Sequence, residues 1–335
     1  MSPGARRVLA GDVGGTHARL ALFEVAEGRR TVLRETVFSS GEYEGLEPIV
    51  REFLREAGGG VPAGCLGVAC PLEEGVCQFS NLEWEIRVDG FGKRVGIPRI
   101  RIINDLEAAG YGVLELEPDD LVTLQEGVPR DRGPMALIGA GTGLGQGFLV
   151  WDQEGYTVHP SEGGHADFAA TDPTQWRLRR YLQLRYGHVS WERLISGHGL
   201  EDAYDFLRDS REIPEGEAVG QELRELRKQG KDTAEAISHH ALEGSDPLSA
   251  AAMEIFLRAF GAQAGNLALT VRATAGVFIA GGIAPKILPK LREGPFLEAF
   301  RSKGRLTALM EKVPVRVIVK DGVGLLGAAA VAERL

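Results

Sequence analysis

Two glycine-rich segments of this 335-residue chain contain the residue types that bind an anion through the backbone. The first, Gly11-Asp12-Val13-Gly14-Gly15-Thr16, places a carboxylate at the end of an apolar run and small residues at a tight turn, where N–H groups can converge on a phosphate. The second has glycine at every other position from Gly139 to Gly147, with Thr142 at the centre of Gly141-Thr142-Gly143. Alternating glycine weakens a strand unless another group approaches its backbone, and we expect that group to be a polyphosphate.

Each segment also has a simpler explanation. The first can be an ordinary hairpin that uses Gly-Gly, and the second a flexible loop, although a loop does not require strict alternation. Neither is a Walker A loop, because no Gly-Lys-Ser/Thr follows, and neither fits the dinucleotide fingerprint, because a strand rather than a helix comes next. A third glycine turn, Gly281-Gly282, follows an apolar run and enters a helix-like stretch.

The apolar pattern predicts the elements that must position these turns. Strand, glycine turn and strand occur twice, at residues 8–25 and 135–151, which indicates an internally duplicated architecture. The small residues of the helix expected after Gly322 allow close packing on a sheet. The other expected elements are strands at 65–70, 100–103, 277–280 and 313–319, short helices at 47–56 and 106–114, and a helical region at 173–275.

Composition limits the class of protein. The chain has 47 acidic and 38 basic residues and a net charge of −9, which excludes an electrostatic footprint for nucleic acid or an anionic membrane. No apolar run is long enough to span a bilayer, so we expect a cytoplasmic protein. The length suggests about two domains, and residues 115–120 form a plausible boundary.

The cysteines predict no redox or metal chemistry. Cys65, Cys70 and Cys77 are odd in number and lack the Cys-x-x-Cys spacing. Cys65 and Cys70 lie in an apolar stretch, so we expect small buried side chains rather than a disulfide or a zinc site.

The glycine turns together with several polar motifs identify a family. The set resembles the actin-like ATPase superfamily of sugar kinases and, within it, the bacterial ATP-dependent glucokinases. The resemblance runs in order from about residue 8 to the C-terminus. Its five motifs are residues 9–22 around the first turn, Ile102–Ala108 with Asn104-Asp105, Gly139–Gly145, Ser161–Phe168 with Glu-Gly-Gly-His, and Glu192–Gly197.

The resemblance implies an α/β fold, the two-domain actin-like ATPase (ribonuclease H-like) fold with its active site in a cleft. A smaller α/β domain would comprise residues 1–115 and be completed by about 316–335, and a larger, helix-rich α/β domain would comprise residues 116–315. The family also implies domain closure around the sugar and a homodimer. The implied reaction transfers the γ-phosphoryl group of ATP to the 6-hydroxyl of glucose.

The implied general base is Asp105, which also has a structural alternative as the N-cap of the helix that follows. Asn104 would hydrogen-bond to sugar hydroxyls. Glu162 and His165, on either side of Gly163-Gly164, would bind further hydroxyls. The sugar contacts would be completed by Glu192, for which a solvated helix carboxylate is the alternative, and by Ser80 and Asn81. A metal site of His159, Glu162 and His165 is a weaker alternative, because glycine and Pro160 break the helix that such a site usually uses.

The implied nucleotide site combines the three glycine turns. Asp12 would hold Mg²⁺ through water, Thr16 and Thr142 would add hydroxyl groups to the phosphate contacts, and the third turn would admit adenosine. The residues are Gly11, Asp12, Val13, Gly14, Gly15, Thr16, Gly141, Thr142, Gly143, Gly281 and Gly282.

Two departures and two rival functions qualify the resemblance. His17 stands where the family usually has Asn, and residues 167–183 lack the cysteines of the related zinc-containing repressor and kinase family, so no zinc site is expected. One rival is a kinase of another hexose or N-acetylhexosamine. The other is a non-catalytic, nucleotide-dependent regulatory protein, which would not need the Asn-Asp and Glu-x-x-His sets.

Overall fold

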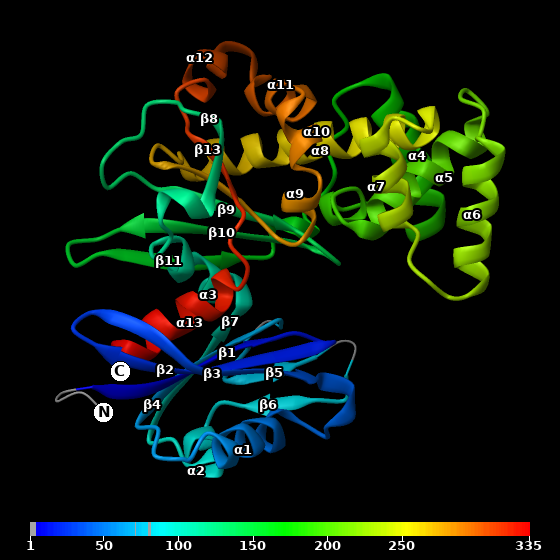
Figure 1. Cartoon of the computed structure of the whole chain (residues 1–335). Coiled ribbons are helices and arrows are strands. Elements are labelled where there is room, and N and C mark those ends of the chain that lie inside the picture. The colour runs from blue at the N-terminus through cyan, green and yellow to red at the C-terminus, as the bar shows by residue number, and fades with distance from the viewer. Residues whose placement is uncertain (1–4, 71, 80–81) are drawn as a thin grey trace. The chain divides into compact units, whose positions relative to one another are not determined.

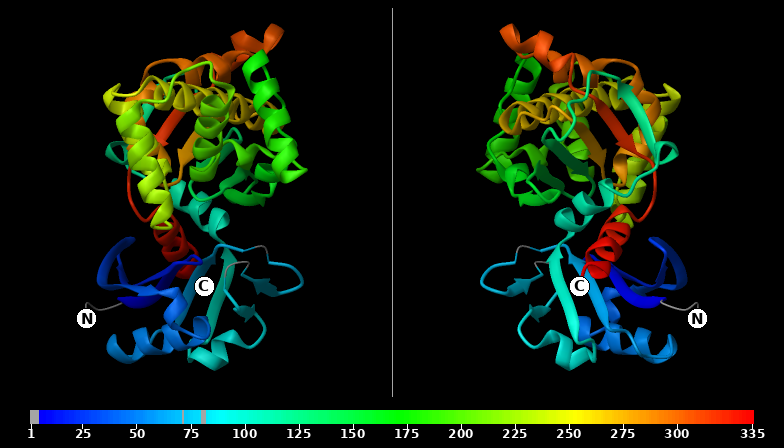
Figure 2. Two further views of the ribbon diagram at one scale, coloured as in Figure 1. Left: turned by 90° about the vertical axis from the view of Figure 1, so that its right-hand side faces the viewer. Right: turned by 90° about the vertical axis from the view of Figure 1, so that its left-hand side faces the viewer.

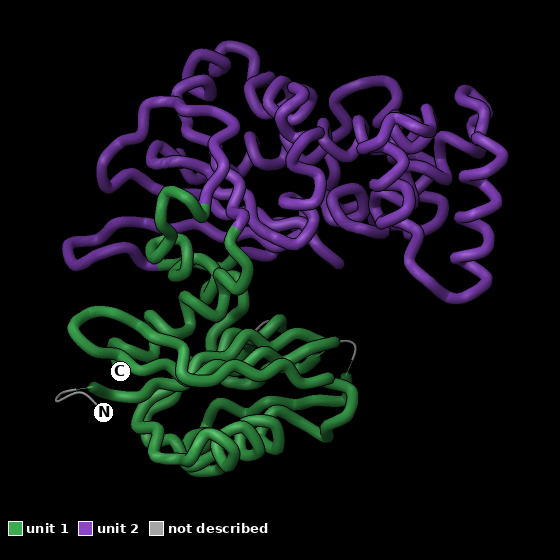
Figure 3. Tube along the Cα trace, in the orientation of Figure 1, with its two compact units in different colours: residues 1–120, 158–160, 320–335 green, residues 121–157, 161–319 purple. Residues whose placement is uncertain are grey.

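The chain divides into two compact units (Figure 3), and each is built on its own β-sheet. The computed structural model describes residues 5–70, 72–79 and 82–335, so the predicted sugar contacts Ser80 and Asn81 lie outside the described residues. Unit 1 comprises residues 1–120, 158–160 and 320–335, and unit 2 comprises residues 121–157 and 161–319.

Unit 1 is a five-stranded sheet with helices on both faces (Figures 1 and 2). Its strand order is β3-β2-β1-β4-β7; β1 is antiparallel to β2 and parallel to β4, and β4 is parallel to β7. Leu9 and alternate residues pack against α1 and α2, whereas Val8 and Ala10 pack against α3 and α13. The elements are β1 (Arg6–Val13), β2 (His17–Ala26), β3 (Arg29–Ser39), α1 (Leu46–Glu56), β4 (Ala63–Val68), β5 (Val76–Gln78), β6 (Glu85–Arg87), α2 (Phe91–Val95), β7 (Arg99–Asn104), α3 (Asp105–Val113) and α13 (Val323–Glu333).

Unit 2 is a six-stranded sheet packed against a set of helices, among which the 25-residue α8 is buried along most of its length (Figure 1). Its strand order is β11-β10-β9-β12-β13-β8. Its strands are β8 (Leu121–Gln125), β9 (Met135–Ala140), β10 (Leu144–Trp151), β11 (Tyr156–Ser161), β12 (Gly276–Ala280) and β13 (Val315–Ile318). Its helices are α4 (Pro173–Tyr186), α5 (Gly197–Ser210), α6 (Glu217–Lys228), α7 (Ala234–Glu243), α8 (Pro247–Val271), α9 (Ile283–Lys286), α10 (Leu288–Arg292), α11 (Pro295–Arg301) and α12 (Thr307–Met310).

The two sheets repeat one topology, in agreement with the duplication inferred from the glycine turns. In each, an antiparallel hairpin (β1–β2 or β9–β10) is followed by two further strands that run parallel to its first strand. Both glycine turns therefore follow the first strand of their repeat.

Among the described residues, no helix has the length and apolar character needed to cross a bilayer.

The predicted elements are present with shifted ends. The packing of the last helix on a sheet is confirmed, because Leu325 and Ala328 of α13 cluster with Val8 and Ala10 of β1. The helix also packs closely on α3, where a Cβ on Gly327 would collide with the backbone of Ala108. The pattern missed β3, whose residues are mostly exposed at the sheet edge and lack a clean alternation. It also missed β5, β6, β8 and β11, of which β5 and β6 have only three residues each.

The expectation that the cysteines form no disulfide is wrong for one pair. Cys70 and Cys77 are bonded to each other, with Cα atoms 5.9 Å apart, because the chain turns back after β4 to begin β5. Both side chains are buried, as expected, and Cys65 is a buried free thiol. Burial raises the pKa of the Cys65 thiol to about 12, so this cysteine is chemically inert near neutral pH.

Candidate functional site

The structure brings the first glycine turn and the Asn104-Asp105 pair to one edge of the unit 1 sheet. Parallel strands β1, β4 and β7 end together there, with Val13 paired to Val68 and Val68 to Asn104. With one strand between them, the ends of β1 and β7 lie about 10 Å apart. In α/β sheets, ligands bind beyond the carboxyl ends of such strands.

The first turn is a tight hairpin held from a neighbouring segment. The backbone N–H of Gly14 donates to the carbonyl of His17 at 2.8 Å, so this amide is already used within the turn. Ser40 donates from its hydroxyl to the carbonyl of Gly14 and from its backbone N–H to the carbonyl of Thr16, both at 2.9 Å. In the part of the chain that the structure describes, the N–H groups of Gly15 and Thr16 have no acceptor. These two backbone amides are therefore available to donate hydrogen bonds to an anion bound at the turn.

The carboxylate of Asp12 lies beside the start of α13. A Cβ on Gly324 would be 3.1 Å from Oδ2 of Asp12, so glycine makes room for it. Burial raises the pKa of Asp12; Arg19 opposes the increase, and Asp321 adds to it. Arg19 donates to Asp321 at 2.8 Å and lies 3.6 Å from Glu35, so its charge is shared among several carboxylates. The negative charge of Asp12 is therefore only partly compensated, and a cation would be attracted to this position.

Asn104 and Asp105 lie where β7 becomes α3. Asn104, not Asp105, occupies the N-cap position of α3. The alternative prediction that Asp105 is the N-cap is therefore wrong by one residue. The N–H of Leu106 donates to Oδ1 of Asn104 at 2.9 Å and to Oδ1 of Asp105 at 2.8 Å. The Asn104 amide group lies 3.5 Å from the carbonyl of Cys70. The shared N–H fixes both side chains at the start of the helix, as a positioned acid–base group requires.

The second glycine turn, in unit 2, is held by Glu192. The N–H of Leu144 donates to Oε2 of Glu192 at 2.9 Å, and a Cβ on Gly143 would lie only 2.5 Å from that oxygen. The carbonyl of Gly141 accepts from the N–H of Gly197 at 3.0 Å. Glu192 is therefore not the solvated helix carboxylate of the alternative explanation. It joins the turn to η4 (Trp191–Arg193).

The turn that contains Glu162 and His165 packs directly on β10. A Cβ on Gly164 would collide with the carbonyl of Leu144, and one on Gly163 would lie 2.6 Å from Oε1 of the buried Gln146. Nδ1 of His165 lies 3.9 Å from Oε1 of Glu192. The structure thus brings His165, Glu192 and the second glycine turn together, while Glu162 has an exposed side chain.

The third turn meets the second at the carboxyl edge of the unit 2 sheet. Strand β12 pairs in parallel with β9, and Ala280 is opposite Gly139. Gly281 has a φ of +86°, and a Cβ there would collide with the carbonyl oxygen of Ala140 and lie 2.7 Å from its nitrogen. Gly282 has no such neighbour. Gly281 is thus required by the fold itself, whereas Gly282 leaves open space.

The alternating glycines divide in a similar way. Gly141 and Gly143 form the turn, whereas Gly139 and Gly145 are directly paired within the strands. A Cβ on Gly139 would lie 3.3 Å from the backbone of Ala280, so close strand packing also contributes to the alternation of glycine.

The alternative metal site of His159, Glu162 and His165 finds no support in the structure. Among the described residues, no three His, Cys, Asp or Glu side chains lie close enough together to hold a metal ion.

Comparison with known proteins decides the family. A family model described as Glucokinase matches residues 9–335, a span that includes every predicted site residue. The chain belongs to the glucokinase family. It is 41% identical over 339 residues to the glucokinase of Nostoc punctiforme, covering 98% of this chain and 99% of that protein. The resemblance inferred from the motifs is confirmed.

Solved glucokinases have the same fold. The glucokinase of an Antarctic psychrotroph is 29% identical and superposes with a TM-score of 0.84 over 98% of this chain and 99% of that one. A ROK family glucokinase from Streptomyces griseus, described as a complex with glucose and AMPPNP, is 22% identical, with a TM-score of 0.64 over 99% and 100% of the two chains. The predicted actin-like ATPase fold is therefore confirmed.

Sequence reasoning missed two side chains that support the turns of this candidate site. Ser40 hydrogen-bonds to Gly14 and Thr16 of the first turn, although it lies 26 and 24 residues further along the chain. No sequence motif marks this serine. Gln146 lies under the Glu-Gly-Gly-His turn, and its Nε2 is buried with no partner among the described residues. A polar residue between Gly145 and Gly147 in an otherwise apolar strand was the one available signal.

Proposed function

We propose that the chain transfers the γ-phosphoryl group of ATP to the 6-hydroxyl of glucose, releasing ADP and glucose 6-phosphate. The observation that carries this proposal is the glucokinase family match across residues 9–335. Asp105, the glycine turns and Glu192 have the chemistry that phosphoryl transfer to a sugar requires: a base, donors to phosphate and a sugar ligand.

Asp105 acts as the general base. As the 6-hydroxyl oxygen forms its bond to the γ-phosphorus and the bond to ADP breaks, the hydroxyl proton passes to the carboxylate. The N–H of Leu106 holds Oδ1 of Asp105. Asn104 has its Oδ1 engaged by the same N–H and donates from its Nδ2 to the carbonyl of Cys70, so its second amide N–H would donate to a sugar hydroxyl.

His165, Glu192 and Glu162 orient the sugar. Since Glu192 also holds the second glycine turn through Leu144, a hydroxyl that hydrogen-bonds to Glu192 would be fixed relative to that turn. The exposed side chains of Glu162 and His165 are available to accept and donate to further hydroxyls. Ser80 and Asn81 remain predicted sugar contacts.

The three glycine turns bind the nucleotide. The N–H groups of Gly15 and Thr16 donate to phosphate oxygens, with the hydroxyls of Thr16 and Thr142 beside them. In the second turn the N–H of Gly141 donates to the carbonyl of Gly143 at 2.9 Å, whereas the N–H groups of Thr142 and Gly143 have no acceptor among the described residues and are the turn's remaining backbone donors. Gly282, with open space around it, admits adenosine.

Asp12 fits a role in holding Mg²⁺. Magnesium in kinases takes one or two carboxylates and completes its shell with water and substrate phosphates, so a lone carboxylate beside a phosphate turn is sufficient. The buried, incompletely paired charge of Asp12 is the feature of this chain that favours a cation. Bound Mg²⁺ would neutralise negative charge on the transferring phosphates.

We further propose that the enzyme acts in the cytoplasm, where ATP is available, and as a homodimer, as its family implies. The proposed domains remain residues 1–115 completed by about 316–335 and residues 116–315, and the division of the chain into two compact units near residues 120 and 320 supports this proposal.

A substrate-by-donor matrix tests the function. ATP, ADP and polyphosphate would each be combined with glucose, mannose, fructose and N-acetylglucosamine, with and without Mg²⁺, and the sugar phosphate measured. The expected result is turnover with ATP, glucose and Mg²⁺ that exceeds every other combination by about tenfold or more. A preference for another sugar would show that this sugar, and not glucose, is the substrate. The absence of turnover with every sugar would favour the alternative of a non-catalytic, nucleotide-dependent regulatory protein.

A further inference from the structure

His17 is the side chain at which the first glycine turn departs from the family, because the glucokinases usually have asparagine at that position. It begins β2, directly after the turn, and its side chain is exposed. Its backbone is held in place, since its carbonyl accepts from the N–H of Gly14 at 2.8 Å and the residue pairs with Ser39 of β3. The imidazole therefore extends from a fixed point beside the turn.

The register of the sheet places His17 on the same face as Asp12. Successive side chains of a strand point to opposite faces, and in β2 Leu20 packs toward α1 whereas Ala21 packs toward α3 and α13. His17 and Arg19 therefore share the face of Ala21. Asp12 is opposite Arg19 in the pairing of β1 with β2 and lies beside the start of α13. The side of the sheet on which Asp12 is proposed to hold Mg²⁺ is thus the side from which His17 extends.

Three consecutive residues at this turn have unused N–H donors. In the part of the chain that the structure describes, the backbone N–H groups of Gly15 and Thr16 have no acceptor, and no group is bonded to the imidazole of His17. Arg19, the next side chain on this face of β2, is already engaged, because it donates to Asp321 at 2.8 Å. Because the unused donors are consecutive, one anion can accept hydrogen bonds from more than one of them.

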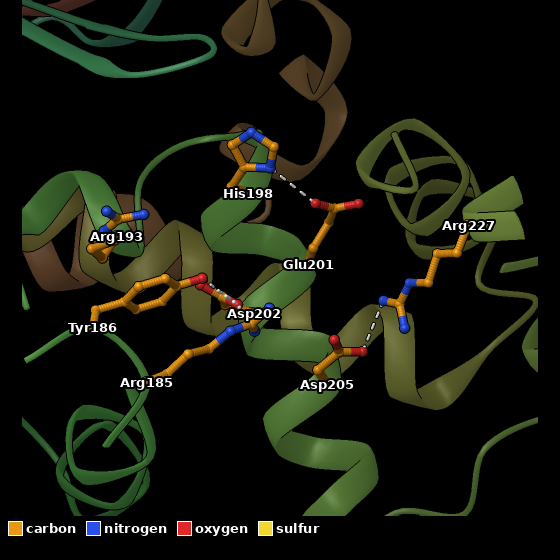
Figure 4. Close-up of a pocket in the computed structure, with 8 residues that line it drawn as sticks. All are labelled: Arg185, Tyr186, Arg193, His198, Glu201, Asp202, Asp205 and Arg227. Atoms are coloured by element: carbon orange, nitrogen blue, oxygen red, sulfur yellow. Dashed lines mark hydrogen bonds and ion pairs between the residues drawn. The ribbon is translucent and has the colours of Figure 1, made fainter. Parts of the chain in front are cut away.

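The missing partner distinguishes His17 from the other histidines of the chain. Each of the other six interacts with a described carboxylate. These carboxylates are Glu192 for His165, Asp167 for His188, Glu201 for His198 (Figure 4), Glu243 for His239, Glu222 for His240 and, electrostatically, Glu107 for His159. Among the described residues, His17 is the one histidine whose donor is left for a ligand.

We propose that the imidazole of His17 is a further ligand of the nucleotide and donates a hydrogen bond to a phosphate oxygen beside the amides of Gly15 and Thr16. This inference rests on the proposed function, in which the phosphates of ATP bind at the first glycine turn. An imidazole has at least one N–H in either charge state, and hydrogen bonds to charged acceptors are the stronger class. Asparagine, the usual residue of the family, also has an N–H, so donation is the chemistry that the two residues share.

A phosphate fits this position better than Mg²⁺ or the sugar. Mg²⁺ takes oxygen ligands, so an imidazole nitrogen is not suited to it. The proposed sugar ligand Asn104 ends β7, which is three strands from β2 in the sheet and therefore about 14 Å away. The positive charge of Arg19 is shared among the carboxylates of Asp12, Glu35 and Asp321. A polyphosphate at this turn therefore depends on N–H donors that are not already engaged.

Kinetics of the full-length chain test this role of His17. His17→Leu removes the N–H but keeps a side chain of similar size, so we expect the KM for ATP to rise about fivefold while the KM for glucose stays within about twofold. The Kd for AMPPNP, measured by calorimetry with Mg²⁺, should weaken by a similar factor. His17→Asn supplies an N–H again and should recover most of the lost affinity. His239→Leu, the same change at an exposed histidine of α7, is the matched control and should leave both KM values within about twofold of the parent.

The outcomes separate this inference from the proposed function. If the parent phosphorylates glucose with ATP and His17→Leu keeps the parent's KM for ATP, the role of His17 alone is overturned. The same conclusion follows if His17→Asn is impaired as strongly as His17→Leu, because the loss would then not come from the missing N–H. If the parent has neither turnover nor affinity for AMPPNP, the proposed function fails and the role of His17 fails with it.

Discussion

Oε2 of Glu192 accepts a 2.9 Å hydrogen bond from the backbone N–H of Leu144, the residue that follows the Gly141–Gly143 turn. Oε1 of the same carboxylate lies 3.9 Å from Nδ1 of His165. One side chain thus holds the proposed phosphate turn and faces a proposed sugar ligand. This geometry gives a physical reason for glycine at position 143, where a Cβ would occupy the space of the carboxylate.

Gly143→Ala should therefore disturb glucose binding through Glu192. The added Cβ would lie 2.5 Å from Oε2 and push the carboxylate away, so we expect the KM for glucose to rise about tenfold. Gly141→Ala is the matched control in the same turn, because no atom lies within 4 Å of its Cβ position, and its glucose KM should stay within about twofold of the parent. Equal glucose KM values for the two variants would contradict this role of Glu192.

Gly281 and Gly282 should respond differently to alanine. At position 281 the left-handed backbone and the nearby Ala140 peptide should make Gly281→Ala destabilising by about 2 kcal/mol or more, measured by chemical denaturation. Gly282→Ala should change the free energy of unfolding by less than about 0.5 kcal/mol, since its Cβ meets nothing within 4 Å. If both variants were equally stable, Gly281 would not be required by the packing of β9 against β12.

Ser40→Ala should loosen the first hairpin. It removes a buried hydroxyl that donates to the carbonyl of Gly14, so we expect a loss of about 1 kcal/mol in stability and a severalfold rise in the KM for ATP. Ser39→Ala is the natural control, because that neighbouring side chain is exposed. A KM for ATP that changes equally in both variants would show that Ser40 does not hold the turn.

Asp12→Asn should stabilise the protein while it removes activity. Because burial raises the pKa of Asp12, the folded chain binds a proton there more tightly than the unfolded chain. The ionised carboxylate thus lowers stability above its folded pKa, and this cost disappears as the pH falls toward the ordinary value of 3.8. The variant should have a higher Tm than the parent at pH 7 and a smaller difference near pH 4. A destabilised variant at pH 7 would contradict this sign.

The glycine turns and Asn104-Asp105 could be predicted because their signals are local. A short run of residues specifies a strand end, a tight turn or a helix start, and the parallel strands then place Asp12 and Asp105 at one sheet edge. The family match follows from the same local motifs in order.

The remaining features depend on chain segments that meet only after folding. Glu192 reaches Leu144 across 48 residues, and Ser40 reaches Gly14 across 26, without any pattern that links them. The Cys70–Cys77 disulfide requires the turn after β4, which the spacing of the two cysteines does not reveal. Part of the glycine pattern attributed to nucleotide binding, at Gly139 for phosphate and at Gly281 for adenosine, is explained by close backbone packing.

The most direct test of the account compares the kcat of the parent and Asp105→Asn for glucose phosphorylation by ATP. The substitution keeps an oxygen that can accept from Leu106, so the start of α3 should remain intact, and ATP affinity should stay within about twofold. If Asp105 takes the proton of the 6-hydroxyl, kcat should fall by about a thousandfold. A folded variant whose kcat remains within about tenfold of the parent would contradict the assignment of Asp105 as the base.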